Sequence, residues 1–547
     1  MKHFSKQNSD NEICANTEEK PLPGLPLRPR LKLDSFDGGM LTQNELRLLK
    51  DYAKSMAPPL NNYSRIGSEE RHRNEFIYGE IGNIFTNLAY IYETTEDIEI
   101  LNILITWVGY IMYGRNDFPS GDGRTNPNPY ITAWKYDSPP PVWPNEPAVS
   151  MQCATGDDYP PNADKIIDCE QGDIFGKFYH VALLIFRNEA LHNQIIPQEI
   201  VPQYYSHRFI NSDICDKVFD DIMDDLLKTK FPDAFGEIGY GKTYLDRALA
   251  LIKFADQTMD VHTAPMFINL RDCNNPNMPF LATSYPSAEH PFWEATGTVS
   301  IPWGADRTMP SNRGFMTLTG FQYGAEAHAW IAENPQYAWI LQNTKHNCRP
   351  LEYCTEMFNP LEEDHSQRRD FWRKIVQTNI SIFEDSFDLR TVDVDGRQIP
   401  TWTFNYYPVD GLNFIEDTGH ASFDAKSYHQ FLRDPRYKSG LGSRHQDIEP
   451  KERMARFVNT IKNVVFRELD NTFAGNVSGH ETDSQRNLRP NFLLLADFGY
   501  SELFDMIHTP YTLEALPYDF HLFSTILYLK ARRNGVEKAT VVNHFPN

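Results

Sequence analysis

The sequence predicts an all-α protein, an (α/α) toroid or barrel of about six helical hairpins around one polar central cleft. Apolar residues recur at the period of an amphipathic helix, roughly 3.6 residues, in about a dozen segments. Short and long connections alternate between these segments, as expected for hairpins whose long loops roof one end of a cleft. An α-solenoid is the rival architecture, but the sequence has no repeat of fixed period.

The periodic segments place the expected helices, in chain order, at residues 42–56, 69–92, 98–113, 172–188, 212–229, 242–260, 313–332, 366–385, 416–433, 450–469, 491–506 and 518–533. Two long irregular stretches, 116–171 and 261–310, are expected to cover the cleft. One minor β-hairpin is expected at 388–394 and 398–405, because an Asp-Gly pair between alternating residues favours a tight turn.

The chain divides into a tail and one domain. Residues 1–35 are expected to be disordered or extended, because prolines crowd the stretch from 21 to 29 and exclude a helix there. Residues 36–547 are expected to form a single toroid domain. A compact hydrophobic core stops growing at about 250–300 residues, but a core that runs as a ring between two layers of helices is not subject to this limit.

Composition narrows the classes of partner. The net charge of −22 repels phosphate backbones and anionic membrane surfaces, so neither nucleic acid nor a membrane is expected as a partner. The sequence has no apolar stretch long enough to span a bilayer and no apolar run near its start. Its seven cysteines show no disulfide framework. These features predict a cytoplasmic protein, and they give no indication of its oligomeric state.

No cofactor is expected. The sequence contains no Walker loop, no glycine-rich dinucleotide fingerprint and no His-Glu-x-x-His zinc motif. The cysteines and histidines also lack the spacing of metal ligands. We therefore expect neither a metal nor a nucleotide cofactor.

The most distinctive motif contains Glu416, Asp417, His420 and Asp424. On a helix, Glu416 and His420 share a face because they are four residues apart, and Asp424 continues that face. A carboxylate can orient an imidazole, so this row predicts His420 as a general base that Glu416 holds in place. The alternative is that the acids favour the helix N-terminus and that His420 is an interior residue with its hydrogen bonds satisfied.

Two further segments carry candidate residues. Trp402, Tyr406 and Tyr407 form an aromatic group just before the acidic motif. Asn312 and Arg313 stand at an expected helix start, where Asn312 could serve only as a cap. An arginine in the first turn opposes the helix dipole, so Arg313 could instead bind a carboxylate ligand with its planar fork.

The polar loop 479–486, with His480 and Arg486, is another candidate for substrate binding, although a solvated surface loop is the simpler explanation. Weaker candidates lie at helical spacing and could form either the inward face of a ring helix or an exposed face. These are Glu80, Asn83, Asn87, Asp173, Lys177 and His180.

Three motifs follow one another in the chain: Asn312-Arg313, the aromatic segment from Trp402 to Tyr407, and Glu416-Asp417-x-x-His420. This order resembles that of the toroidal uronate polysaccharide lyases that cleave alginate and glucuronan. The resemblance covers residues 310–510. It implies that Asn312 and Arg313 neutralise the uronate carboxylate. It further implies that His420 or Tyr406 removes the C5 proton and that Tyr407 protonates the leaving oxygen.

The sequence therefore predicts a carbon–oxygen lyase that acts on a uronate-containing saccharide by proton abstraction and β-elimination. A second hypothesis keeps the fold and predicts a cytosolic isomerase, dehydratase or cyclase of a small, partly apolar metabolite. A third predicts a non-catalytic helical scaffold. Basic residues converging on the cleft would favour the lyase, an apolar aromatic cleft would favour the isomerase, and a cleft without an acid–base pair would favour the scaffold.

Overall fold

The computed structural model describes residues 28–35, 39–56, 80–115, 118, 143, 170–201, 217–264, 268–270, 279–281, 311–340, 364–405, 415–437, 445, 447–467, 472–480 and 488–537. Most of these residues are helical, as the sequence predicts. The α-helices are α1 (Gln43–Ser55), α3 (Glu80–Thr95), α4 (Ile98–Tyr113), α6 (Glu170–Phe186), α7 (Phe219–Lys230), α8 (Pro232–Phe235), α9 (Tyr244–Thr258), α11 (Ser311–Glu333), α12 (His365–Asp385), α13 (Thr418–Leu432), α14 (Pro450–Thr460), α15 (Pro510–Ala515) and α16 (Phe520–Asn534).

Shorter helical elements connect them. The 3-10 helices are η3 (Glu189–Leu191), η7 (Pro335–Ile340), η8 (Pro435–Tyr437), η10 (Pro490–Phe498) and η11 (Ser501–His508). Helices α9 and α14 each continue into one turn of π-helix, η6 (Met259–Thr263) and η9 (Ile461–Val465).

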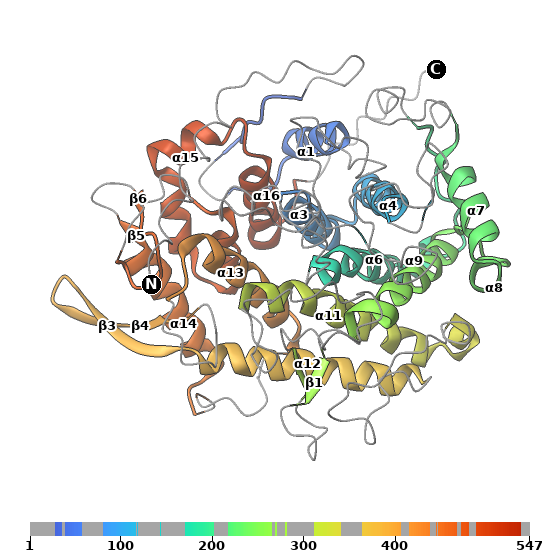
Figure 1. Ribbon diagram of the computed structural model, residues 1–547. Coiled ribbons are helices and arrows are strands. Elements are labelled where there is room, and N and C mark those ends of the chain that lie inside the picture. Colours follow the sequence, from blue (N-terminus) through green and yellow to red (C-terminus); the bar gives the residue numbers. More distant parts are fainter. Residues whose placement is uncertain are drawn as a thin grey trace, which may run out of the picture.

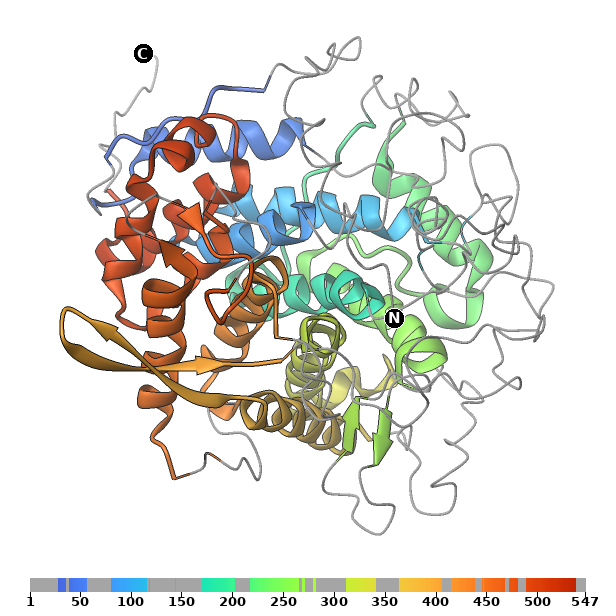
Figure 2. The same cartoon turned by 60° about the vertical axis from the view of Figure 1, so that its left-hand side comes forward.

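Strands in the described parts of the chain pair as antiparallel two-stranded hairpins. They are β1 (Ile268–Leu270) with β2 (Pro279–Leu281), β3 (Asp388–Val394) with β4 (Arg397–Thr403), and β5 (Phe466–Arg467) with β6 (Thr472–Phe473). The β3–β4 pair confirms the hairpin that the Asp-Gly turn predicts, and it extends away from the helices (Figures 1 and 2). The other two pairs were not predicted.

Two predicted helices end earlier than their apolar pattern suggests. The α-helical part of 450–469 stops at Thr460, and the chain then forms one turn of π-helix, Ile461–Val465, before strand β5. The segment 491–506 forms two 3-10 helices in place of one α-helix. Gly499 divides them because its φ of 99° lies in the left-handed region.

Helices α6 and α11 lie in close contact because glycines face the neighbouring helix. A Cβ atom on Gly172 of α6 would lie 2.4 Å from Cα of Thr317, and one on Gly320 of α11 would lie 2.4 Å from the ring of Phe175. Neither distance is possible for a real side chain. Glycine at both positions therefore sets the spacing of the two helices.

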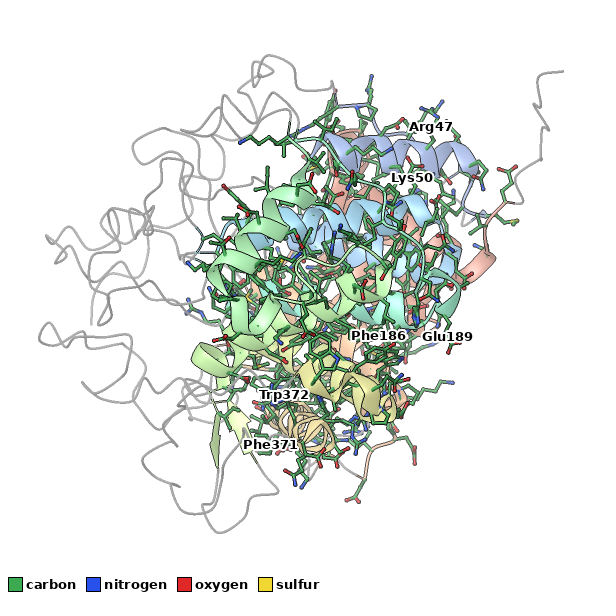
Figure 3. All side chains as sticks on the ribbon, turned by 90° about the vertical axis from the view of Figure 1, so that its right-hand side faces the viewer. Arg47, Lys50, Phe186, Glu189, Phe371 and Trp372 are labelled. Carbon is green, nitrogen blue, oxygen red and sulfur yellow. The ribbon has the colours of Figure 1, made fainter. Side chains whose placement is uncertain are left out.

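The core surrounds helices α3, α6, α11, α13 and α16, which are buried along most of their length. Helix α16 contacts α3, α3 contacts α6, α6 contacts α11, and α11 contacts α13 (Figure 1). The 3-10 helix η10 contacts both α13 and α16, while α4, α9 and α12 pack against α3, α6 and α11 respectively. Figure 3 places Arg47 of α1 and Trp372 of α12 at opposite ends of the molecule.

A network of charged groups joins the C-terminal ends of these core helices. Glu93 of α3 accepts hydrogen bonds from Arg433 at the end of α13 (2.5 Å) and lies 3.3 Å from Nε2 of His180 on α6. Asp497 of η10 accepts a hydrogen bond from the hydroxyl of Tyr528 on α16 (2.6 Å). Helix α11 joins them through Tyr323, whose ring stacks on that of His180 with the centroids 4.1 Å apart.

The two ends of the described chain are held together by a buried ion pair. Glu45 of α1 accepts two hydrogen bonds from the ammonium group of Lys530 on α16, at 2.5 and 2.7 Å, and both side chains are buried. Leu31, in the extended segment 28–35, is also buried and donates its backbone N–H to Pro517. Within the described residues, no helix is both long and apolar enough to cross a membrane.

Candidate functional site

The N-terminus of α13 carries the acidic motif. Asp417 is the N-cap of this helix, and its Oδ1 atom accepts the backbone N–H of His420 at 2.9 Å. The other carboxylate oxygen of Asp417 bonds Nδ1 of the same histidine. Since a carboxylate only accepts, the proton is assigned to Nδ1. One aspartate therefore starts the helix and fixes the imidazole ring at its first turn, where 44% of the histidine side chain is exposed.

This geometry corrects the prediction that Glu416 holds His420. The helix begins two residues later than predicted, at Thr418, so Glu416 precedes the cap and its spacing to His420 is not helical. Oε1 of Glu416 lies 3.9 Å from Nδ1 of His420, beyond hydrogen-bond range. The backbone of Glu416 is instead extended between Phe404 and Val477, bonding each through the main chain.

Glu416 and Asp424 form a buried carboxyl pair beneath the Asp417–His420 contact. Both side chains are fully buried, and they lie within hydrogen-bond reach of each other. Burial and the charges of Asp424 and Asp417 raise the pKa of Glu416 well above its ordinary range. Burial and the charge of Asp417 raise the pKa of Asp424 in the same way. Both shifts favour the protonated forms of these two carboxyl groups.

The pKa of Asp417 moves in the opposite direction. Partial burial alone would raise it, but the hydrogen bonds and charge of His420 outweigh that effect and lower the pKa. Asp417 is thus ionised at neutral pH, whereas the pKa values of Glu416 and Asp424 are shifted toward the protonated form. pKa values shifted in opposite directions at neighbouring acids suit acid–base chemistry.

A basic cluster combines residues from the middle of α6 and α13 with residues at the starts of η10 and α16. Its members are Lys177 of α6, Lys426 of α13, Arg489 just before η10, and His521 of α16. Both lysines approach Asp173: Nζ of Lys177 is 2.6 Å from Oδ2, and Nζ of Lys426 is 4.0 Å from Oδ1. The two lysines and the aspartate are each at most 6% exposed. Two ammonium groups thus share one buried carboxylate.

The charges of the basic cluster act on one another and on the pKa values of its members. Burial lowers the pKa of Lys177 to about 8; Asp173 opposes this shift and the charge of Lys426 adds to it. Burial and the charges of Lys426 and Arg489 lower the pKa of His521 to about 3, so this ring is neutral at pH 7 and donates to Oδ1 of Asn491 at 3.0 Å. Arg489 also acts on Asp417, which joins the cluster to the helix cap.

The remaining predicted site residues fall in different places. The prediction that Trp402 binds substrate is corrected by its burial. Its ring is fully buried and its indole N–H donates to the carbonyl oxygen of Arg453 at 3.0 Å, so it belongs to the core and does not line a binding surface. Tyr406, Tyr407 and Arg486 lie outside the described residues.

Asn312 and Arg313 lie in the first turn of α11, close to the predicted helix start. Asn312 is buried, and its Oδ1 atom accepts no hydrogen bond within the described residues. It stands two turns before Thr319, on the same face of α11, and Thr319 is bonded by Gln430 of α13. The Asn312 amide thus lies on the side of α11 that faces α13. Arg313 is half-buried.

His480 is exposed at the end of the segment 472–480, which pairs with the motif through a β-bridge between Asn476 and Asp417. The weaker candidates Asn83, Asn87, Asp173, Lys177 and His180 are all buried, which decides against an exposed face. Lys426, Arg489 and His521 were not predicted. Lys426 lies on the helix that begins with the acidic motif, whereas Arg489 and His521 lie next to helix starts at which the sequence analysis names no candidate.

One group of side chains could hold a metal ion. Ligand atoms of Glu416, Asp417 and His420 lie within 4.8 Å of one another. Carboxylate and imidazole ligands suit several divalent cations. Because Nδ1 of His420 is already bonded to Asp417, a cation would have to replace that hydrogen bond. These three residues belong to the acid–base motif that the sequence predicts, and the sequence predicts no metal there.

Comparison with protein-family models, with curated proteins and with solved structures finds no match for this chain. Its function must therefore be argued from the side chains themselves.

Proposed function

We propose that this protein is an (α/α) toroid enzyme, a carbon–oxygen lyase that cleaves a uronate-containing saccharide by proton abstraction and β-elimination. Its site lies where the core helices begin, with His420 as the general base, Asp417 as the residue that positions it, and the basic cluster as the binding site for the substrate carboxylate.

The contacts between helices support a closed ring. The order α3, α6, α11, α13, η10 and α16 has each element touching the next, and α16 touches α3. Helices α4, α9 and α12 each follow one of these elements in the chain and pack against it. These three pairs have the alternation of an (α/α) toroid, which we propose for the whole domain. The N-terminal ends of the ring elements would then surround one mouth.

The observation that carries the functional proposal is the basic cluster beside an imidazole–carboxylate pair. The chain has a net charge of −22, yet two lysines meet at one buried aspartate between α6 and α13. A buried positive charge without a full counter-charge is costly. A substrate carboxylate next to Lys426 would supply that counter-charge, and the N-termini of the helices would favour the same negative group.

The proposed reaction follows from these positions. The ring of His420 takes the C5 proton, the electron pair of that bond forms the C4–C5 double bond, and the C4–O bond breaks. Binding of the uronate carboxylate by the basic cluster stabilises the negative charge that develops beside C5. The leaving oxygen takes a proton either from Tyr407 or from the imidazolium that the first step forms.

The same features weigh against the two alternatives. A small, partly apolar metabolite would not need two lysines and an arginine in its site. A scaffold would not need an imidazole held by a carboxylate at an exposed helix start. We therefore favour the lyase over the isomerase, dehydratase or cyclase and over the scaffold.

The experiment that tests the proposal follows the unsaturated product. Purified protein is incubated with uronate polysaccharides and with a neutral polysaccharide, and the ultraviolet absorbance of the new double bond is recorded. The proposal predicts absorbance with at least one uronate polymer and none with the neutral one. Absence of product from every uronate substrate would reject the lyase. Loss of hydrogen at C5 without cleavage would favour an isomerase.

A further inference from the structure

We propose that the outer edge of strand β3 pairs with the same strand of a second copy of this chain and so forms a two-fold dimer. Strands β3 and β4 together form an arm, residues 388–403, that extends away from the helices in two views (Figures 1 and 2). The proposal concerns the backbone of this arm, so it does not depend on the lyase activity.

Hydrogen bonds on the β4 side show which way the peptide groups of the arm point. The N–H and the C=O of Trp402 both bond the hydroxyl of Thr460 on α14, at 2.8 and 2.7 Å. In an antiparallel pair, two facing residues either bond each other or both turn their peptide groups outward. Trp402 faces Leu389, so the N–H and C=O of Leu389 also point away from β4. Because the pattern repeats at every second position, Thr391 and Asp393 point outward as well.

This outward edge of β3 is open. Among the described residues, no hydrogen bond reaches the outward backbone groups of Leu389, Thr391 or Asp393. All three residues are exposed, and Leu389 is 55% exposed although it is apolar. Natural sheets protect such an edge with a proline, a lysine, a bulge or a covering segment. Strand β3 pairs with β4 without a bulge and contains neither proline nor lysine, so it lacks these protections.

The opposite edge of the arm is closed. Thr460 bonds Trp402, and the side-chain amide of Asn459 donates to the carbonyl oxygen of Pro400 at 3.0 Å. Pro400 also lacks the N–H that a further strand would need. An arm with one open edge takes one partner strand. Two copies related by a two-fold axis therefore satisfy each other and leave no edge for a third copy.

The charges of the arm favour a second copy as the occupant. The whole chain has a net charge of −22, but the arm has two arginines and three aspartates, so its net charge is 2 − 3 = −1. An antiparallel pairing overlaps the arms and keeps the two acidic helical bodies at opposite ends of the joined sheet. A parallel pairing would place these bodies side by side, where like charges repel. The copies thus meet at a nearly neutral segment in antiparallel orientation.

The positions of the charges select the register. With Thr391 on the two-fold axis, Thr391 bonds its own counterpart and Leu389 bonds Asp393 of the second copy, so all three outward residues are used. A shift of two residues in one direction would place Arg390 opposite Arg390, which is unfavourable. The same shift in the other direction would place Leu389 opposite Asp395, which lies in the turn with a φ of 53°. The register centred on Thr391 avoids both problems.

The test is the oligomeric state of the full-length protein, measured by sedimentation equilibrium at concentrations up to about 100 μM. Thr391→Pro removes the outward N–H at the axis and leaves the bonds to β4 intact, because that N–H takes no part in the hairpin. Thr391→Lys places two like charges opposite each other. Thr391→Ala is the matched control, since it keeps the N–H and adds no charge.

We expect wild type and the Ala variant to form dimers with similar dissociation constants. The Pro variant should raise the dissociation constant roughly 10- to 100-fold, because each copy loses a backbone hydrogen bond at the axis. The Lys variant should raise it roughly two- to fivefold, and it decides the question if the Pro variant does not fold. Hydrogen exchange of the 389–393 backbone should be slower at high than at low concentration in wild type only.

Two results would overturn the proposal. One is a wild-type protein that is monomeric up to about 100 μM. The other is a dimer whose dissociation constant neither the Pro nor the Lys variant changes, because the interface would then lie elsewhere. These measurements need no substrate, so their outcome is independent of the lyase assay.

Discussion

Asp417 binds His420 twice, once through the backbone N–H that it caps and once through Nδ1 of the imidazole. The cap therefore fixes both where α13 begins and how the proposed base is oriented. A change in this aspartate affects the helix and the ring together, and suitable substitutions separate the two effects.

Asp417→Ser keeps a capping oxygen but is too short to hold the imidazole, whereas Asp417→Ala loses both contacts. We expect the Ala variant to lose about 0.5–2 kcal/mol of stability and the Ser variant to lose little, because serine is a good N-cap. Both should lose roughly tenfold to a thousandfold in kcat, less than loss of the base itself. Chemical denaturation and turnover, measured on the same two proteins, check this. Equal stability losses would show that capping is not the role of Asp417.

Lys426→Met should weaken substrate binding without destabilising the fold. The change removes a buried ammonium group and keeps the volume of the side chain, so the unfolding free energy should stay the same or rise. Loss of a charged contact to the substrate carboxylate costs about 1.5–3 kcal/mol, which corresponds to roughly a 10- to 100-fold increase in KM. An unchanged KM would remove Lys426 from the proposed binding site.

Asp497→Asn should destabilise the far end of the core helices by about 3–5 kcal/mol at pH 7, because it breaks a buried charge network. Burial alone would raise the pKa of Asp497, but His429, Tyr528 and Arg433 outweigh this effect and lower it well below 3.8. A carboxyl group whose pKa is lower in the folded state than in the unfolded chain stabilises the fold at pH values above the unfolded pKa. This stabilisation is lost as the pH falls. The difference between wild type and variant should therefore shrink below about pH 4.

Arg532→Gln is the matched control for this network. Its guanidinium also bonds Asp497, at 3.1 Å, but 54% of its side chain is exposed. Solvent screens such a contact, so we expect a loss of about 0–1 kcal/mol. Urea unfolding at two pH values measures both proteins. Similar losses for the two variants would contradict the importance of burial.

Gly172→Ala should cost more stability than Gly320→Ala. A methyl group on Gly172 meets the backbone of Thr317, which cannot move without shifting α11, whereas one on Gly320 first meets the ring of Phe175. Overpacking of this kind costs typically 1–3 kcal/mol. Thermal or chemical unfolding of the two variants gives the order directly. The reverse order would show that the two helices are free to separate.

The helices could be predicted because their cause is local. An apolar face at helical period has one stable arrangement, and α4 has the bounds that its pattern predicts, while α12 differs by one residue at its start. The start of α13 was misplaced by two residues because Glu416 and Asp417 are both acids that favour a helix N-terminus. The pattern alone does not show which of them is the cap.

The site was predicted only in part because its second half depends on packing between distant segments. His420 and Asp417 could be found since they are neighbours in the chain. The meeting of Lys177 with Lys426 depends on how α6 and α13 pack around α11, and no spacing in the sequence encodes that distance. The burial of Trp402 likewise follows from contacts with α14 that the aromatic pattern does not reveal.

The central claim is that His420 is the general base of the site, and the most direct measurement is turnover of His420→Ala together with its melting temperature. The account predicts that turnover on a uronate polymer falls by roughly two to four orders of magnitude while the melting temperature stays near that of wild type. A variant with full turnover, or one whose activity falls only in proportion to the unfolded fraction, would contradict it.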